Sequence, residues 1–172
     1  AFDALLSPTS LTENRPALDD INGWSQRMDA VAGETDLANG QRTFHHSSVA
    51  LCARCHRHSG RGTTVGPDLS AVAARKDRHW LLESILLPSR EIAPEFLPRS
   101  ITLKDGTEAT GIRLRSWTRE QLRDANGHTL SFETKDVASI RELTTSFMPA
   151  GLVYSLTDRE LRDLLAFLES SE

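Results

Sequence analysis

Three residues with the chemistry of a covalent cofactor site lie within five positions of the chain: Cys52, Cys55 and His56. Both cysteines of the 172-residue chain stand here, three positions apart, and a histidine follows the second one directly. This spacing is the pattern for covalent attachment of c-type haem. Each thiol adds across one vinyl group of the porphyrin, and the adjacent imidazole supplies an iron ligand. Chance produces such an arrangement in roughly one of 2,500 chains of this composition. We therefore expect one haem c, attached through Cys52 and Cys55.

Other kinds of site use the same side chains. A zinc site needs four nitrogen or sulfur ligands, and without a second cysteine pair His45, His46 or His58 would have to complete it. A thioredoxin-like dithiol belongs in a βαβ unit, which the helical pattern around the motif does not offer. A plain buried pair of cysteines leaves His56 without a role. The other histidines have no spacing that demands a metal and are expected mostly at the surface or at caps: His45, His46, His58, His79 and His128.

A haem iron also requires a sixth ligand or an open position. Of the two methionines, Met28 lies on the apolar stripe of a predicted helix, where core packing is expected. Met148 directly precedes Pro149, whose ring stiffens the backbone that must hold a thioether on iron. A ligating imidazole also donates its second N–H to a fixed acceptor. The Pro67 carbonyl is a candidate for that acceptor, and an ordinary turn is the alternative.

Four helices are predicted to position these residues, because apolar side chains recur at helical spacing in four stretches: 17–31, 35–46, 77–86 and 157–168. Asp77 is a plausible N-cap, and Thr157 with Glu160 forms a capping box. Residues 1–16 are rich in turn-forming residues and predict an irregular lead-in. A further loop is expected at 59–68, where three glycines and Pro67 gather.

The region from about 95 to 143 has a different pattern. Apolar residues alternate there with polar ones, and Asp105-Gly106 and Asn126-Gly127 divide the runs. Both dipeptides favour the positive φ angles of tight hairpins. We expect four or five short antiparallel strands that form a small barrel or a curled sheet.

The composition limits the partners. The chain carries 20 Lys and Arg against 24 Asp and Glu, a net charge of −4, so it has no electrostatic preference for nucleic acid or anionic membranes. The longest apolar runs, 49–53 and 164–168, are too short to cross a bilayer, and no transmembrane segment is predicted. Residues 1–6 lack the pattern of a signal peptide, which suggests a mature end or a fragment of a longer chain.

Together these positions resemble class I cytochrome c. The resemblance lies in Gly40 and Phe44 on one helix, the motif at 52–56, Gly66-Pro67-Asp68-Leu69, and Met148-Pro149 before a closing amphipathic helix. More narrowly, the stretch 40–168 resembles the planctomycete-type cytochrome c haem-binding domain. That narrower likeness is carried by Leu81–Ile85, Pro88-Ser89, Leu103–Gly106, Met148–Leu152 and Leu156–Leu168.

The resemblance implies an α+β chain with a mainly α-helical cytochrome c fold, an inserted antiparallel β module and an N-terminal helical extension. The expected divisions are 1–35 for the extension, 36–94 and 144–172 for the haem domain, and 95–143 for the β module. It also implies that two helices cross near the haem edge. Gly40 and Phe44 of the first would then lie against Leu164 and Phe167 of the last. His56 and Met148 would then hold the iron, with Pro67 accepting from the His56 ring.

The implied function is single-electron transfer between redox partner proteins, with no substrate at the metal and no enzymatic activity. The alternatives are a haem enzyme or gas sensor with an open distal site, and the electron-transfer domain of a larger dehydrogenase. Assembly of haem c outside the cytoplasmic membrane implies a periplasmic or secreted location in bacteria. Domains of this type often end large secreted proteins, so a multidomain parent chain is expected. The β module is expected either to cover the haem edge or dock a partner, or to be a solvated insert, and its two ends should lie close together.

Overall fold

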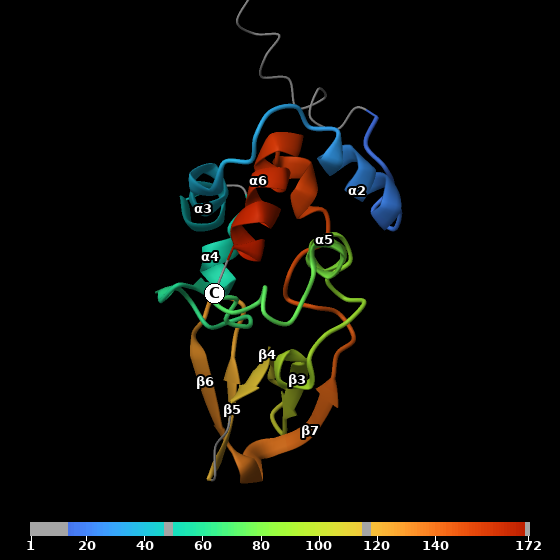
Figure 1. The fold of residues 1–172 in the computed structure, drawn as a ribbon. Coiled ribbons are helices and arrows are strands. Elements are labelled where there is room, and N and C mark those ends of the chain that lie inside the picture. The colour runs from blue at the N-terminus through green and yellow to red at the C-terminus, as the bar shows by residue number, and fades with distance from the viewer. Residues whose placement is uncertain (1–13, 47–49, 115–117, 171–172) are drawn as a thin grey trace, which may run out of the picture.

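The computed structural model describes residues 14–46, 50–114 and 118–170. Helix makes up 36% and strand 23% of this structure. The expectation of a mainly α-helical fold is therefore wrong, because the helices are short and a five-stranded antiparallel sheet takes a large share of the chain. Figure 1 shows the longer helices at one end of the molecule and this sheet at the other. The lead-in predicted for 1–16 lies, up to residue 13, outside the described residues.

The helices begin and end close to the predicted positions. They are α2 (Ile21–Asp29), α3 (Leu37–His46), α4 (Cys52–Cys55), α5 (Arg78–Leu86) and α6 (Asp158–Glu169). Asp77 caps α5 by accepting from the Trp80 N–H at 2.9 Å. The capping box of Thr157 and Glu160 is present at the start of α6. Short 3₁₀ turns add η2 (Pro94–Phe96), η3 (Thr134–Asp136) and η4 (Leu152–Ser155). No described helix has the length and apolar character that a membrane crossing requires.

The helices share one apolar core. Trp24 and Met28 of α2 pack in the same buried cluster as Leu82 of α5 and Leu165 of α6. The core position predicted for Met28 is thus confirmed. Arg15 reinforces this packing from the N-terminal side, because its buried guanidinium donates to the carbonyls of Val153 and Leu156. The N-terminal helix is therefore an integral part of the helical core.

Helices α3 and α6 cross at Gly40, as the resemblance implied. A Cβ at Gly40 would lie 2.0 Å from the Asp163 carbonyl oxygen, so only glycine permits this approach. Beside the crossing, the rings of Phe44 and Phe167 lie with centroids 5.9 Å apart. Leu164 is buried in the same cluster.

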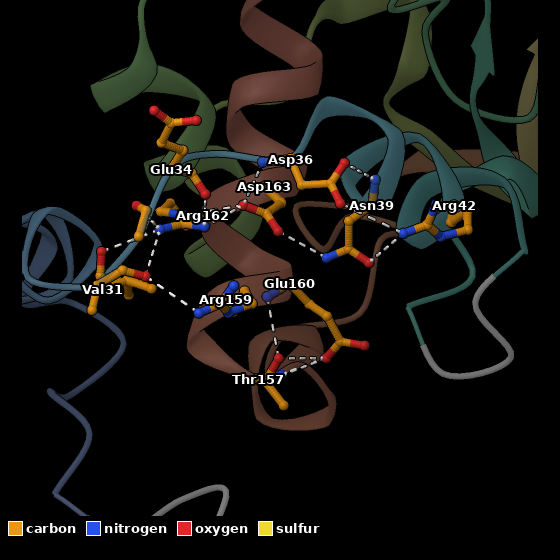
Figure 2. A network of polar contacts seen from close by, with 12 residues as sticks. Val31, Glu34, Asp36, Asn39, Arg42, Thr157, Arg159, Glu160, Arg162 and Asp163 are labelled. Atoms are coloured by element: carbon orange, nitrogen blue, oxygen red, sulfur yellow. Dashed lines mark hydrogen bonds and ion pairs between the residues drawn. The ribbon is translucent and has the colours of Figure 1, made fainter.

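A buried polar network fixes the segment that leads into α3 (Figure 2). Arg162 of α6 donates to four consecutive backbone carbonyls, those of residues 31–34. The same guanidinium donates to the carboxylate of Asp163, which is fully buried. Asp163 also accepts from Asn39 Nδ2 at 2.8 Å and from the Asp36 N–H at 3.2 Å. Arg162 and Asp163 are therefore buried together with hydrogen-bond partners for both of their charges.

The β region contains five antiparallel strands, as predicted. They are β3 (Pro98–Leu103), β4 (Glu108–Leu114), β5 (Arg119–Arg123), β6 (Thr129–Glu133) and β7 (Val137–Glu142), in the spatial order β6-β5-β4-β3-β7. The Asp105-Gly106 and Asn126-Gly127 turns join β3 to β4 and β5 to β6, each with its glycine at positive φ. Because β6 and β7 lie at the two edges of this order and do not pair with each other, the described strands form an open sheet and not a closed barrel.

The last strand of this sheet returns to the first. Strand β7 pairs with β3, and the Leu143 N–H donates to the Pro98 carbonyl at 2.8 Å. The two ends of the β region therefore lie side by side, as expected. A second, very small sheet pairs β1 (Arg57–His58) with β2 (Arg61–Gly62), within a stretch partly predicted as loop.

Candidate haem site

The haem-attachment motif occupies α4 and the residue after it. One helical turn separates Cys52 from Cys55, and the His56 N–H closes that turn on the Cys52 carbonyl at 2.8 Å. At His56 the backbone becomes extended, with φ −108° and ψ 145°. Both thiols and the imidazole are thus presented from a single turn of backbone, which is the donor set that haem c requires.

The electrostatics of the two thiols argue against a redox-active dithiol. Burial raises the pKa of Cys52 to about 11, and burial also raises the pKa of Cys55. The two cysteines are not joined to each other by a disulfide. Reactive dithiols have a lowered pKa and a thiolate at neutral pH, so these cysteines do not have that character. Their electrostatics and their spacing instead suit a haem-attachment site.

The His56 ring is oriented by the loop that follows it. Its Nδ1 lies 2.9 Å from the Pro67 carbonyl oxygen. A carbonyl only accepts hydrogen bonds, so Nδ1 must carry the proton and Nε2 keeps its lone pair. Burial lowers the pKa of His56 and outweighs the opposite effect of the Pro67 hydrogen bond. The ring is consequently neutral at pH 7, with Nε2 in the form that binds a metal.

Gly66 lies against this ring and, together with the Pro67 carbonyl, forms a cradle for it. A Cβ at Gly66 would lie 2.7 Å from His56 Cε1 and 2.9 Å from Nδ1. The Gly66 N–H donates to the Cys55 carbonyl at 2.7 Å, and the Thr63 hydroxyl donates to the Arg54 carbonyl at 2.6 Å. The loop at 63–67 is therefore fastened to α4 while it packs on the imidazole. The donor set and the cradle together fit haem c.

Met148 lies in the loop between β7 and η4 and is half-buried. Its N–H donates to Ser146 Oγ at 3.1 Å, and the Ser146 N–H donates to Ser89 Oγ at 3.0 Å. These bonds tie the loop to the turn after α5. Iron ligation by Met148 stays a prediction.

His58 departs from the expectation that the other histidines lie at the surface. Only 2% of this residue is exposed, and its ring lies 4.3 Å from that of Phe167 and 5.5 Å from that of Phe44, between centroids. Its position in the core depends on α6, which is distant in sequence, so local spacing could not reveal it. No group of three or more His, Cys, Asp or Glu in the described part of the chain is placed to hold a metal ion, so a zinc site has no ligand set there.

Comparison with known proteins gives a family. The family model described as cytochrome c matches residues 37–126, which run from the start of α3 into the turn between β5 and β6. This match covers more than half of the chain and includes the motif at 52–56, whereas Met148 and α6 lie beyond it. No curated protein matches the chain. The protein belongs to the cytochrome c family and carries haem c bound covalently through Cys52 and Cys55.

Proposed function

We propose that this protein is a monohaem carrier of single electrons in which His56 and Met148 hold the iron. The observation that carries the proposal is the 2.9 Å contact between His56 Nδ1 and the Pro67 carbonyl. This contact leaves Nε2 unprotonated, and a carbonyl that accepts from Nδ1 both orients a metal-bound imidazole and makes it a stronger ligand. An electron-transfer role without catalysis accords with the family.

Each residue around the haem has a distinct role in electron transfer. The bound haem supplies an iron that gains and loses one electron. The Pro67 carbonyl keeps the proton on Nδ1 and fixes the plane of the ring, and Gly66 keeps the loop against it. Met148 is presented by a loop held through Ser146 and Ser89. Ligands held this firmly in both oxidation states need little reorganisation, and methionine sulfur favours the ferrous state and a raised potential.

The finer assignments form part of the same proposal. The chain is of the planctomycete type and acts outside the cytoplasm, in the periplasm or after secretion, as one unit of a larger multidomain protein. Its parts are an N-terminal extension (1–35), a haem domain (36–94 and 144–172) and an inserted β module (95–143). Support for the insertion comes from the paired ends of β3 and β7, which return the chain to the haem domain next to the place where it left.

The test is carbon monoxide binding to the ferrous holoprotein. A low-spin spectrum that carbon monoxide does not change is expected for the native protein, because both axial positions are filled. Met148→Ala should turn this into a high-spin spectrum with rapid binding. Met28→Leu, a nearly volume-conserving change in the core, is the matched control and should leave ligation unchanged. A native protein that is already high-spin and binds carbon monoxide rapidly would refute Met148 ligation and favour an open-site haem enzyme or gas sensor.

A further inference from the structure

The β5–β6 hairpin contacts the loop that carries the cradle of His56. Arg123, the last residue of β5, donates from Nη1 to the Thr64 carbonyl at 2.8 Å and to Thr64 Oγ1 at 2.7 Å. These residues are 59 positions apart in the sequence. In Figure 1 the ends of β5 and β6 nearest the helices lie below α4 and the segment that follows it. Arg123 thus links the sheet to the loop at 63–67.

Hydrogen bonds fix the turn of the β5–β6 hairpin, which begins directly after Arg123. Asp124 accepts from the N–H groups of Asn126 and His128, and its own N–H donates to the His128 carbonyl at 2.9 Å. Gly127 has φ 88°, and a Cβ placed on it would lie 3.5 Å from Val65 Cγ2. Val65 is buried. The hairpin tip therefore packs against the residue that follows Thr64, beside the hydrogen bonds of Arg123.

Thr64 is only two residues from Gly66, which lies against the His56 ring. Thr64 and Val65 are followed by Gly66, whose Cα packs on the His56 ring, and by Pro67, whose carbonyl faces Nδ1. On the other side, Gly66 is bonded to the Cys55 carbonyl. The loop is therefore held between α4 and the β5–β6 hairpin. The loop that Arg123 contacts therefore carries Gly66 and Pro67, the two residues that lie against the His56 ring.

We propose that Arg123 is a positioning residue for His56, and that the β module acts as a brace on the histidine side of the haem. This inference rests on the proposed function in taking His56 as an iron ligand. The brace holds the Pro67 carbonyl at the Nδ1 proton and so maintains the basicity of the imidazole. When the brace is lost, the His56–Pro67 hydrogen bond weakens, His56 becomes a weaker donor to ferric iron, and the reduction potential rises.

Arg113 supplies a matched control. It lies on the neighbouring strand β4 and pairs with Glu120 of β5 instead of with the loop. Arg123→Met and Arg113→Met each remove one positive charge from the same sheet. Loss of a cation alone disfavours the added electron and lowers the potential. The two effects have opposite signs, so a loss of positioning can be distinguished from a loss of charge.

The experiment compares both variants as holoproteins by amide hydrogen exchange and by redox titration. For Arg123→Met we expect exchange at Val65 and Gly66 to be about tenfold faster, the effect of losing roughly one charged hydrogen bond. We also expect its potential to lie above that of Arg113→Met. Arg123→Lys, which keeps the charge and a donor, should restore part of both properties. Equal behaviour of the two methionine variants, or a change in only one of the two measurements, would overturn the proposal.

Two further measurements keep the outcome unambiguous. If Arg123→Met does not fold, Thr64→Val takes its place, because it removes only the Oγ1 acceptor, and it should give smaller changes in the same directions. Failure of Met148 ligation would be seen separately, as carbon monoxide binding to the native protein. That result leaves the exchange and potential comparisons intact, because His56 and the attached haem are unchanged.

Discussion

Replacement of Gly40 by alanine places a methyl group where α3 and α6 touch. An ideal Cβ at this position lies 2.0 Å from the Asp163 carbonyl oxygen and 2.7 Å from Phe167 Cβ. Ordinary van der Waals contact begins at 3.4 Å. The nearest obstacle is backbone, which cannot rotate away as a side chain can. The two helices must therefore move apart by about 1 Å or more at the crossing, which affects every contact between them.

The cost of this separation can be estimated from the residues beside the crossing. Phe44, Leu164 and Phe167 are all buried there. A gap of about 0.5–1 Å removes a quarter to a half of the dispersion energy of each contact, and overpacked cores lose about 1–3 kcal/mol. A backbone clash belongs at the upper end of that range. Alanine recovers about 1 kcal/mol through its higher helix propensity. The expected net loss is about 2 kcal/mol of unfolding free energy, or about 4–8 °C in Tm.

The assay is urea unfolding of the holoprotein followed by far-UV circular dichroism. Gln41→Ala is the matched control, because Gln41 is exposed on the same helix and gains only propensity. It should be as stable as the native protein or slightly more stable. If Gly40→Ala proves as stable as Gln41→Ala, the helices do not cross at the distance described, and the reasoning is refuted.

Two further predictions concern the buried charges. Burial raises the pKa of Asp163, but hydrogen bonds from Asn39 and Arg162 outweigh it and hold the net pKa below its usual value. A depressed carboxyl stabilises the fold above about pH 4 and loses this contribution as the pH falls through the folded-state pKa. Asp163→Asn should therefore be less stable at pH 7, with a difference from the native protein that narrows on acidification in urea titrations; a constant difference would contradict this. Arg15→Met should lower the free energy of unfolding by about 2 kcal/mol, because the Val153 and Leu156 carbonyls lose their donor. Arg27→Met is the control and should cost under about 1 kcal/mol, because the Arg27 side chain is more exposed. Equal losses for the two variants would contradict a stabilising role of the buried Arg15 guanidinium.

Much of the fold follows from local sequence signals. The N-cap at Asp77 and the capping box of Thr157 and Glu160 satisfy backbone donors within three residues, so neither depends on the rest of the fold. The turns at Gly106 and Gly127 require positive φ, which glycine adopts readily. These short-range rules define both the helix starts and the strand pairs. They do not define the balance of helix and strand, which is why the mainly helical fold expected from the resemblance was wrong.

The parts that the sequence could not predict depend on distant partners. Arg162 and Asp163 are charged neighbours, a pattern that ordinarily indicates a solvated helix face. They are buried because the carbonyls of residues 31–34 and the side chain of Asn39 close over them (Figure 2). Arg15, in a predicted irregular segment, is buried for the same kind of reason. At the haem site the motif was visible in the sequence, whereas the contact between Arg123 and Thr64 joins two elements whose packing no local pattern encodes.

The five-stranded β region lies between His56 and Met148 in the sequence. His56 and Met148 are 92 residues apart in the chain. Because β3 and β7 pair at the ends of the region, the effective path between the two residues is about half as long, and halving a loop saves only about 0.6 kcal/mol of closure entropy. The entropy of loop closure therefore neither disfavours nor accounts for the position of the β region between His56 and Met148. Ile101, Ile112 and Leu122 of the sheet are buried and lie outside the apolar cluster that the helices share. Arg123 is then best understood through its effect on the loop at 63–67, where a small displacement alters the hydrogen bond of His56.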